Sequence, residues 1–450
     1  SHGPTLYEIS ELDNLAVSLL NKPRQHSKGA VVKKNPLDTR VVVTGLGTVN
    51  PLGNSVAEFW ENLVAGKSGI RLSRKVDLSE YHVKIAGEVD LPEDLSEYFS
   101  SKKMIKRLDD YIIYAHIAGV QALKDSGLEV DKAPERYGAL IGSGDGGLKT
   151  QMENIDRLFT TGLGSTSPFY VISAIPSTGS AYFALEKNLQ GPSFSVNSAC
   201  ATANHAIGLA AGMIKMGMAD AIFTGGAEAA VNQAGICGFG NIMALSDRND
   251  SPETASRPFD KDRNGFVLSE GAGVILLEEL EHALARDAHI YAEIAGYGFT
   301  TDAHDLVAPH PDARNSSIAM KIAMETAGIN PDQVGLINAH GTSTPVGDRI
   351  ESKAITRAYG EYGRKVPVHS TKSMTGHLLG GASALEAIAA MLAFERNVAH
   401  PSINIFEQDP EVDLTVITEP RDTSKLEYVM SNAFGFGGHN ACILFSRFTG

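Results

Sequence analysis

A cysteine stands where an expected strand gives way to an expected helix. Cys200 belongs to the run Asn-Ser-Ala-Cys-Ala-Thr-Ala at 197–203. Residues 192–196 before it look like a short strand, and the apolar stretch 205–214 after it is long enough for a buried helix. The first free N–H groups of such a helix would face the sulfur, and their positive potential lowers a thiol pKa and favours the nucleophilic thiolate. The alternative is a packed, unreactive thiol, because free cysteine is among the most buried residue types.

A nucleophilic cysteine needs partners elsewhere in the chain, and three polar stretches of the second half supply candidates. They follow expected strands and are 338–345 (Asn-Ala-His-Gly-Thr-Ser-Thr-Pro), 370–377 (Ser-Thr-Lys-Ser-Met-Thr-Gly-His) and 432–440 (Asn-Ala-Phe-Gly-Phe-Gly-Gly-His-Asn). Ligands in open α/β folds bind at the carboxyl ends of strands, so we expect these stretches and Cys200 to meet. A single loop histidine is usually structural. Three polar strand ends together with a cysteine predict a shared catalytic site.

The elements that would position these residues alternate between strands and helices. Buried strands such as 137–141 and 221–227 are separated by helical segments, and the same alternation of strands and helices continues after residue 290. This alternation predicts an α/β fold with parallel sheets and helices on both faces. Because no low-complexity linker intervenes, we favour two similar halves fused face to face over two independent domains. The predicted parts are an N-terminal extension or expression remnant (1–39), a half carrying the nucleophile (40–290) and a half carrying the catalytic histidines (291–450).

Two glycine-rich segments suggest nucleotide or phosphate binding, but neither completes its motif. Gly45 and Gly47 follow a β-branched strand, yet the dinucleotide pattern needs Gly or Ala at position 50 and this chain has Asn50. The loop 142–147 could cradle a phosphate through its N–H groups, but it lacks a Gly-Lys-Ser/Thr ending. We therefore expect a tight, close-packed turn at the first segment and close backbone packing at the second.

Composition excludes several classes of function. A net charge of −14 and a pI near 5.5 argue against a general nucleic-acid or anionic-membrane surface. The densest basic run, 102–107, is by charge alone most typical of a solvated helix start. Three widely spaced cysteines predict neither a disulfide framework nor a zinc site, and they favour a reducing compartment. Lys215 and Asp220 interrupt the longest apolar stretch, so we expect no membrane span, and no secretory signal is visible.

Taken in order, these motifs resemble the β-ketoacyl-acyl-carrier-protein synthases, most closely the type II elongating condensing enzymes of dissociated fatty-acid synthesis. The resemblance rests on the sequences around Cys200, around His340 and from Lys372 to His377, and on the Gly-Phe-Gly-Gly turn. It extends from about Arg40 to the C-terminus. It implies a thiolase-like fold, in which two related α/β halves stack as five αβαβα layers. It also implies a cytoplasmic homodimer that needs no cofactor or metal of its own, because phosphopantetheine arrives on the acyl carrier protein.

The resemblance implies a reaction as well. Cys200 would attack the thioester of an acyl carrier protein, giving an acyl-enzyme and a ping-pong cycle. The backbone N–H groups of Cys200 and Phe436 would form an oxyanion hole. Malonyl carrier protein would then lose carbon dioxide, and His340 and His377 would stabilise its enolate-like oxygen as neutral donors. The carbanion would attack the acyl group, so the implied activity is decarboxylative Claisen condensation to a 3-oxoacyl carrier protein in fatty-acid elongation.

Other residues take supporting roles by the same resemblance. Lys372 would pair with Glu386 and orient the site, in preference to transferring a proton. Thr342 and Thr344 would hydrogen-bond the phosphopantetheine arm. The remaining substrate-binding positions are the hydrophobic gates Phe266 and Phe436, then Phe434, Asp145, and a basic cluster that would dock the acidic carrier protein, formed by Lys102, Lys103, Lys106 and Arg107.

Two departures from the family pattern leave the acyl length preference open. Asp145 stands in the Gly-Ser-Gly-x-Gly-Gly loop, where type II enzymes commonly carry a branched apolar residue that lines the far end of the acyl pocket. A buried carboxylate there is costly unless it is paired. His304 and Val307 replace the Tyr and Thr that are common near the pantetheine channel.

Alternatives remain from other classes. A ketosynthase of a polyketide or specialised-lipid pathway is one alternative, because Asp145 could indicate an unusual acyl chain. A catalytically silent chain-length partner would lack the nucleophile that Cys200 provides. A thiolase would need a second catalytic cysteine, and Cys–His protease chemistry would leave the second histidine without a role.

Overall fold

Ten strands form one continuous sheet in the computed structural model, which describes residues 38–450. The extension expected over 1–39 lies almost entirely outside the described residues. In spatial order the first half contributes β4 (Tyr137–Gly142), β5 (Ala221–Glu228), β6 (Gly271–Glu279) and β1 (Val41–Val49). The order continues from β1 through the second half with β7 (Ala292–Thr301), β14 (His439–Ser446), β13 (Tyr428–Gly435), β8 (Val334–Asn338), β9 (Pro367–His369) and β11 (Thr415–Val416).

The two halves repeat one plan of strand pairing. In the first half, β1 pairs antiparallel with β6, β6 antiparallel with β5, and β5 parallel with β4. In the second half, β7 pairs antiparallel with β14, β14 antiparallel with β13, and β13 parallel with β8. The halves join where Val42 and Val43 of β1 pair with β7. The division at residue 290 remains a prediction.

The expectation of parallel sheets holds for only part of each half, because each half also contains antiparallel neighbours. In the second half a tight turn joins β13 to β14, and such a turn can connect only antiparallel strands. Residues 428–435 and 439–446 therefore form an antiparallel hairpin.

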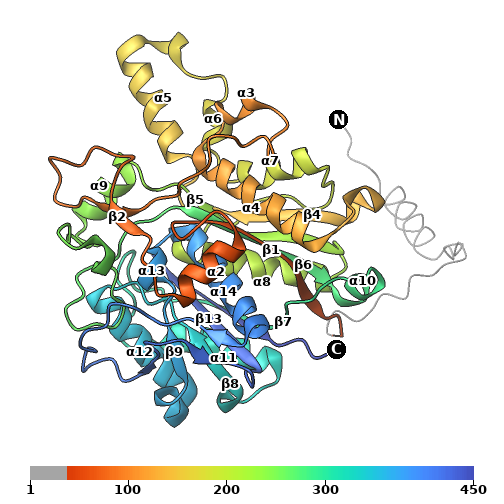
Figure 1. Cartoon of the computed structure of the whole chain (residues 1–450), viewed down its shortest axis with the longest axis vertical. Helices are drawn as coiled ribbons and strands as arrows, with labels where there is room; N and C mark the ends of the chain where they lie inside the picture. The colour runs from red at the N-terminus through yellow and green to blue at the C-terminus, as the bar shows by residue number, and fades with distance from the viewer. Residues whose placement is uncertain (1–37) are drawn as a thin grey trace, which may run out of the picture. The chain divides into compact units, whose positions relative to one another are not determined.

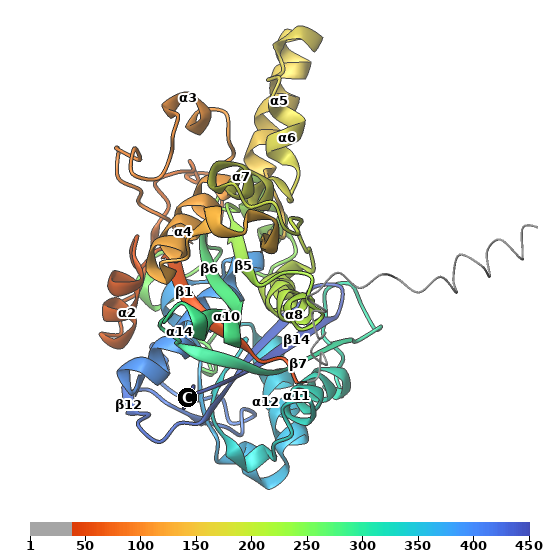
Figure 2. The ribbon, with the colours of Figure 1, turned by 90° about the vertical axis from the view of Figure 1, so that its right-hand side faces the viewer.

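Helices cover both faces of the sheet and also fill the space between its two halves. α4 (Asp110–Ser126) and α7 (Thr178–Lys187) cover the outer face of the first half. α11 (Arg314–Ala327), with α12 (Pro345–Tyr359) beside it, covers the outer face of the second. α8 (Thr202–Lys215) and α14 (Ala382–Arg396) each contact strands of both halves. The layers follow one another from top to bottom in Figure 1, and Figure 2 shows the same stack from the side. This αβαβα arrangement is the predicted thiolase-like fold.

The middle layer explains why two helices are apolar on nearly every face. Every residue of α14 from Ala382 to Phe394 is buried, and ten of the fourteen residues of α8 are buried. A helix that is hydrophobic all round needs apolar neighbours on all sides. Burial between two sheet halves supplies them.

Paired glycines let one helix approach each half of the sheet closely. A Cβ on Gly45 of β1 would lie 2.4 Å from the carbonyl oxygen of Ala122 in α4. A Cβ on Gly296 of β7 would lie 2.1 Å from that of Ala323 in α11. Gly45 and Gly47 therefore serve close packing, as expected, but they lie within a strand and form no turn.

The remaining elements are short or peripheral. The other strands are β2 (Ile70–Leu72), β3 (Ile85–Gly87), β10 (Val398–Ala399) and β12 (Arg421–Asp422). The other α-helices are α2 (Val56–Val64), α3 (Lys102–Ile105), α5 (Leu148–Thr161), α6 (Tyr170–Ala174), α9 (Gln233–Asn241), α10 (Leu280–Ala285) and α13 (Lys372–Thr375). Within residues 38–450, no helix combines the length and the apolar character that crossing a membrane requires.

A short 3₁₀ turn precedes each of the two central helices. Ala199–Ala201 leads into α8 and Leu379–Gly381 leads into α14. Each turn opens with a residue in the left-handed region, with φ of 50° at Ala199 and 45° at Leu379. The two turns pack against each other. They are equivalent positions of the repeated plan, and only one of them carries a cysteine.

The strand expected at 192–196 is reduced to a single bridge between Ser193 and Ala139. Ala139 exchanges backbone hydrogen bonds with Pro192 and Phe194, and the chain then leaves the sheet edge. Cys200 thus precedes a helix, as predicted, but it does not follow a full strand.

Candidate active site

Cys200 lies at the start of the buried helix α8, in the first of the two 3₁₀ turns. The Sγ atom is 3.0 Å from Nε2 of His377, and the backbone N–H of Phe436 also donates to the sulfur. Burial raises the pKa of this thiol to about 12, against the opposing effects of the Lys372 charge and the Phe436 N–H. The predicted lowering of the thiol pKa is therefore wrong for the resting protein, because the cost of desolvating a thiolate exceeds the favourable potential at the helix start.

The two predicted histidines meet beside this thiol. His340 follows β8 and His377 follows α13, and their ring centroids are 5.3 Å apart at an interplanar angle of 85°. Burial holds both pKa values well below the usual histidine range, and the nearby positive charge of Lys372 lowers them further. One ligand atom from each of Cys200, His340 and His377 lies within 4.8 Å of the others. The site therefore holds a thiol and two neutral imidazoles.

Lys372 and Glu386 form the predicted ion pair behind the histidines. Lys372 opens α13, Glu386 lies in α14, and both side chains are about 1% exposed. Burial raises the pKa of Glu386 to about 7, and the adjacent Lys372 charge opposes that rise. Neither residue lines the cavity described below, and the Lys372 charge acts on both histidines.

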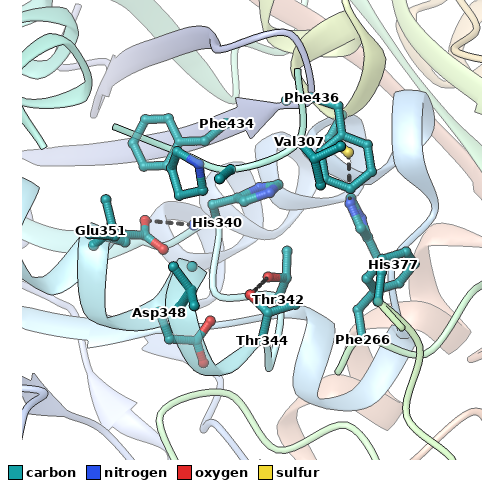
Figure 3. Close-up of a pocket in the computed structure, with 18 of the residues that line it drawn as sticks. Phe266, Val307, His340, Thr342, Thr344, Asp348, Glu351, His377, Phe434 and Phe436 are labelled. Atoms are coloured by element: carbon teal, nitrogen blue, oxygen red, sulfur yellow. Dashed lines mark hydrogen bonds between the residues drawn. The ribbon is translucent and has the colours of Figure 1, made fainter. Parts of the chain in front are cut away.

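A cavity of about 340 Å³ leads to these three groups. The predicted residues Phe266, Thr342, Thr344, Phe434 and Phe436 line it together with Cys200 and both histidines. The two threonine hydroxyls lie 3.1 Å apart on one wall (Figure 3). At its rim, the side chains of Met243, Val307 and Val346 are at least half exposed, so the cavity opens to solvent between apolar side chains.

Aromatic side chains surround the inner end of the cavity. The Phe266 ring lies 5.2 Å from that of His377, and the Phe434 ring lies 5.9 Å from that of His340. Phe239 of α9 contacts both Phe266 and Phe436, with ring centroids 5.6 and 6.1 Å away. Phe239 was not among the predicted residues, because its helix carries no motif. The gating roles of Phe266 and Phe436 remain predictions.

Glu351 is a second residue that the sequence analysis missed. Its carboxylate accepts the backbone N–H groups of His340 at 2.8 Å and Gly341 at 2.7 Å, and Asn432 donates to it as well. Burial raises its pKa to about 7, while these hydrogen bonds oppose the rise. Asp348 and Glu351 are one helical turn apart on the buried face of α12, and this spacing of carboxylates on an apolar face was the available signal.

Asp145 lies beyond Cys200 and is not among the residues lining the cavity. Its loop is held by Glu228, which accepts from the Ser143 hydroxyl and from the N–H groups of Gly144, Asp145 and Gly380. The Asp145 carboxyl is largely buried, which raises its pKa. A Cβ on Gly380 would lie 2.5 Å from the Gly144 nitrogen, so this loop is closely packed, as predicted. A substrate-binding role for Asp145 remains a prediction.

The basic cluster lies on the surface of the first half, outside the cavity lining. Lys102 and Lys103 belong to α3, Lys106 and Arg107 follow it, and all four lie at the surface. Lys102 lies 3.5 Å from Asp94, and the Arg107 guanidinium lies over the Phe169 ring at 4.8 Å. A docking role for the cluster remains a prediction.

Two family models match most of the described chain, up to residue 406. The N-terminal domain of β-ketoacyl synthase matches residues 38–283, and the C-terminal domain of β-ketoacyl synthase matches residues 291–406. The chain belongs to the β-ketoacyl synthase family. Within this family it has a Cys-His-His site, formed by a thiol from the first half and two imidazoles from the second.

Curated relatives match this β-ketoacyl synthase over most of its length. The 3-oxoacyl-[acyl-carrier-protein] synthase 2 of Coxiella burnetii is 46% identical over 411 residues, covering 91% of this chain and 98% of that protein. The protein of the same name from Staphylococcus aureus is 43% identical over 410 residues, with the same coverage of 91% and 98%.

Solved structures share the fold. A β-ketoacyl synthase from Burkholderia phymatum has a TM-score of 0.85 at 33% identity, covering 91% of this chain and 100% of that one. A type II polyketide ketosynthase in complex with its acyl-carrier protein has a TM-score of 0.84 at 31% identity, with the same coverage of 91% and 100%. This β-ketoacyl synthase therefore has the thiolase-like architecture of its structural relatives.

Proposed function

We propose that this β-ketoacyl synthase elongates fatty acyl chains by condensing malonyl-acyl carrier protein with an acyl group held on Cys200. The observation that carries the proposal is the group formed by Cys200, His340 and His377, whose ligand atoms lie within 4.8 Å at the inner end of one cavity. The relatives named 3-oxoacyl-[acyl-carrier-protein] synthase 2 favour fatty-acid elongation over a polyketide pathway.

In the first half-reaction the thiol becomes an acyl-enzyme. Nε2 of His377, 3.0 Å from Sγ, accepts the thiol proton as the sulfur bonds to the thioester carbon. The N–H groups of Cys200 and Phe436 stabilise the negative oxygen of the tetrahedral intermediate. The phosphopantetheine sulfur then leaves and takes the proton from His377, so that the imidazole is neutral again.

In the second half-reaction malonyl carrier protein enters the same cavity. Its C–CO₂⁻ bond breaks, carbon dioxide leaves, and the electron pair forms an enolate whose oxygen accepts hydrogen bonds from the neutral His340 and His377. The enolate carbon attacks the acyl carbon, and the C–S bond to Cys200 breaks. The released Cys200 thiolate takes up a proton from solvent, and the product is a 3-oxoacyl carrier protein.

Phosphopantetheine reaches this site as part of the substrate. Thr342 and Thr344 line the cavity that leads to Cys200. Their hydroxyls can hydrogen-bond the amide groups of the phosphopantetheine arm. We expect the reaction to need no separate cofactor or resident metal. We also propose a cytoplasmic location, because Cys200 must stay reduced in order to act as the nucleophile.

Intact-mass measurement of the acyl-enzyme tests the proposed function. Mixing the protein with acyl carrier proteins of graded acyl length is expected to add one acyl mass per chain. Peptide mapping is expected to place the acyl group on Cys200 rather than on the half-exposed Cys237. Subsequent malonyl carrier protein should remove the adduct and release the 3-oxoacyl product. A wild-type protein that gains no mass from any acyl carrier protein would contradict the proposal.

We further propose that the basic surface cluster Lys102, Lys103, Lys106 and Arg107 docks the acidic carrier protein. Replacing Lys102 and Lys106 together with glutamate is expected to raise the Kd for carrier protein about tenfold at low salt. Alkylation of Cys200 by iodoacetamide should be unchanged. The matched control is Lys124→Glu with Lys132→Glu, an equal charge change at exposed lysines of the same half. Equal weakening by both pairs would assign the effect to net charge and not to this cluster.

We also propose that the enzyme is a homodimer. An apolar surface is formed by residues on α5, on α6 and next to these two helices. α5 projects away from the layers, as Figure 1 and Figure 2 show. The exposed side chains of this surface are Ile155, Phe159, Leu163, Val171, Ile172 and Ile175. Phe159 and Leu163 are 82% and 87% exposed in the single chain. An apolar surface of this kind is typical of a subunit interface.

Sedimentation equilibrium is expected to give about twice the chain mass of 47.9 kDa. The double variant Phe159→Asp with Leu163→Asp should sediment as a monomer, because two charges would be buried in the interface. The exposed Phe406, on the second half, gives a matched control as Phe406→Asp, which should remain dimeric. A monomeric wild-type protein would rule the homodimer out.

A further inference from the structure

The side chains of the nucleophile and the two histidines are also a set of ligands for a soft or borderline metal ion. Among residues 38–450 they are the group of three His, Cys, Asp or Glu side chains placed to converge on one ion. Thiolate sulfur and neutral imidazole nitrogen are the ligands that Zn²⁺ prefers, and three protein ligands with one open position form a common zinc geometry. We propose that Cys200, His340 and His377 bind Zn²⁺ reversibly and that the bound ion blocks the enzyme.

The distances suit a tetrahedral ion without large movement. Zn–S and Zn–N bonds of about 2.3 and 2.1 Å place neighbouring ligands roughly 3.4–3.6 Å apart. The Sγ to Nε2 distance between Cys200 and His377 is 3.0 Å, and all three ligand atoms lie within 4.8 Å of one another. Side-chain shifts of about half an ångström to one ångström would therefore bring them to the spacing that tetrahedral coordination requires.

The protonation states and the access route also favour binding. Each imidazole places one ring nitrogen in the group, and a neutral ring has its lone pair there or exposes one by a change of tautomer. Binding replaces the S–H bond of Cys200 by an S–Zn bond, and the proton passes to solvent without any change of oxidation state. The cavity that admits the pantetheine arm opens to solvent, so a hydrated ion can reach the thiol.

Two features limit the affinity and make binding reversible. The Lys372 charge lies close enough to influence both histidines, although Glu386 and the newly formed thiolate offset it. The Nδ1 atoms of His340 and His377 have no hydrogen-bond partner within the described part of the chain. Zinc sites normally hold their histidines through such partners, whose loss costs about 10- to 100-fold in affinity. We therefore expect a site weaker than a structural zinc centre, from which a chelator removes the ion.

Binding is tested without reference to catalytic activity. Calorimetric titration with Zn²⁺, on purified protein freed of any affinity tag, is expected to give one site per chain. Co²⁺ should give a thiolate-to-metal absorption band. Cys200→Ala should abolish the band and weaken Zn²⁺ binding on the order of 100-fold or more, and His340→Ala should weaken it at least about tenfold. Retention of both signals in Cys200→Ala would overturn the proposal.

A second experiment uses the wild-type protein, so that it does not depend on the folding of any variant. Zn²⁺ is expected to slow iodoacetamide alkylation of Cys200 at least about tenfold, and EDTA should restore the rate. Alkylation of Cys237 serves as the internal control, and Mg²⁺, which prefers oxygen ligands, should protect neither. His304→Ala removes the surface histidine pair with His310, whose rings are 4.7 Å apart, and should leave the protection intact. Unprotected Cys200 at saturating Zn²⁺ would exclude this site even if the condensing function is upheld.

Discussion

Replacing Cys200 with alanine is expected to abolish condensation and to leave decarboxylation of malonyl carrier protein in place. The acyl-enzyme needs the sulfur, and removing a catalytic nucleophile typically costs roughly 10⁴- to 10⁶-fold in rate. Carbon dioxide release needs only the two neutral imidazoles that face the same cavity. The variant should therefore still release carbon dioxide, now with acetyl carrier protein as the product.

The two histidine variants are expected to differ from Cys200→Ala and from each other. His340→Ala should slow carbon dioxide release on the order of 10²–10³-fold, the usual cost of losing one donor to a developing oxyanion. It should still form the acyl-enzyme, because the imidazole nitrogen hydrogen-bonded to Sγ belongs to His377. His377→Ala should impair both half-reactions.

Intact mass after mixing with acyl carrier protein reports the first half-reaction, and labelled carbon dioxide released from malonyl carrier protein reports the second. The prediction would fail if His340→Ala lost acyl-enzyme formation as severely as Cys200→Ala does. In that case the two histidines would act as one unit, and the separation of their roles would be wrong.

Breaking the buried ion pair is expected to produce the largest loss of stability. Lys372→Met or Glu386→Leu alone leaves a charge without its partner at a site about 1% exposed, which typically costs about 3–5 kcal/mol in the free energy of unfolding. The double variant removes both charges and replaces them with apolar side chains. It should therefore be less destabilised than either single variant.

Denaturant unfolding of the four proteins in this double-mutant cycle measures the coupling between the two side chains. Condensation by the double variant then separates support from chemistry. If Lys372 orients the site, a folded double variant should retain measurable condensation at a reduced rate. A double variant with native stability and no detectable condensation would assign Lys372 a direct chemical role. Additive effects in the cycle would show that the pair contributes little stability.

The sequence was sufficient to find the three side chains that meet in the candidate active site, because polar residues concentrate in short motifs at the ends of predicted strands. Cys200, His340 and His377 come from three separate stretches, and the rule that ligands of α/β folds bind at the carboxyl ends of strands correctly predicted that these stretches meet. The alternation of strands and helices likewise predicted the fold class. Its five-layer form came from family resemblance.

The parts that were missed depend on burial and on contacts across the fold. The helix start at Cys200 was recognisable, but its pKa follows the depth of burial, and no local pattern gives that depth. Glu351 acts on the backbone of His340 from a different element, and Phe239 reaches the site through two other aromatic rings. The segment 192–196 has strand-like residues, yet it leaves the sheet after one bridge.

The two 3₁₀ turns before α8 and α14 occupy equivalent positions in the repeated plan of strand pairing, but their residues have different roles. One presents Cys200, whereas the other offers glycine backbone, including the Gly380 N–H that binds Glu228. In a symmetric pair of identical half-length chains, every substitution would appear at both turns at once. Joining the halves in one polypeptide removes that constraint. The sequence at each helix start can then change independently. One start can therefore carry a reactive side chain while the other keeps a purely structural role.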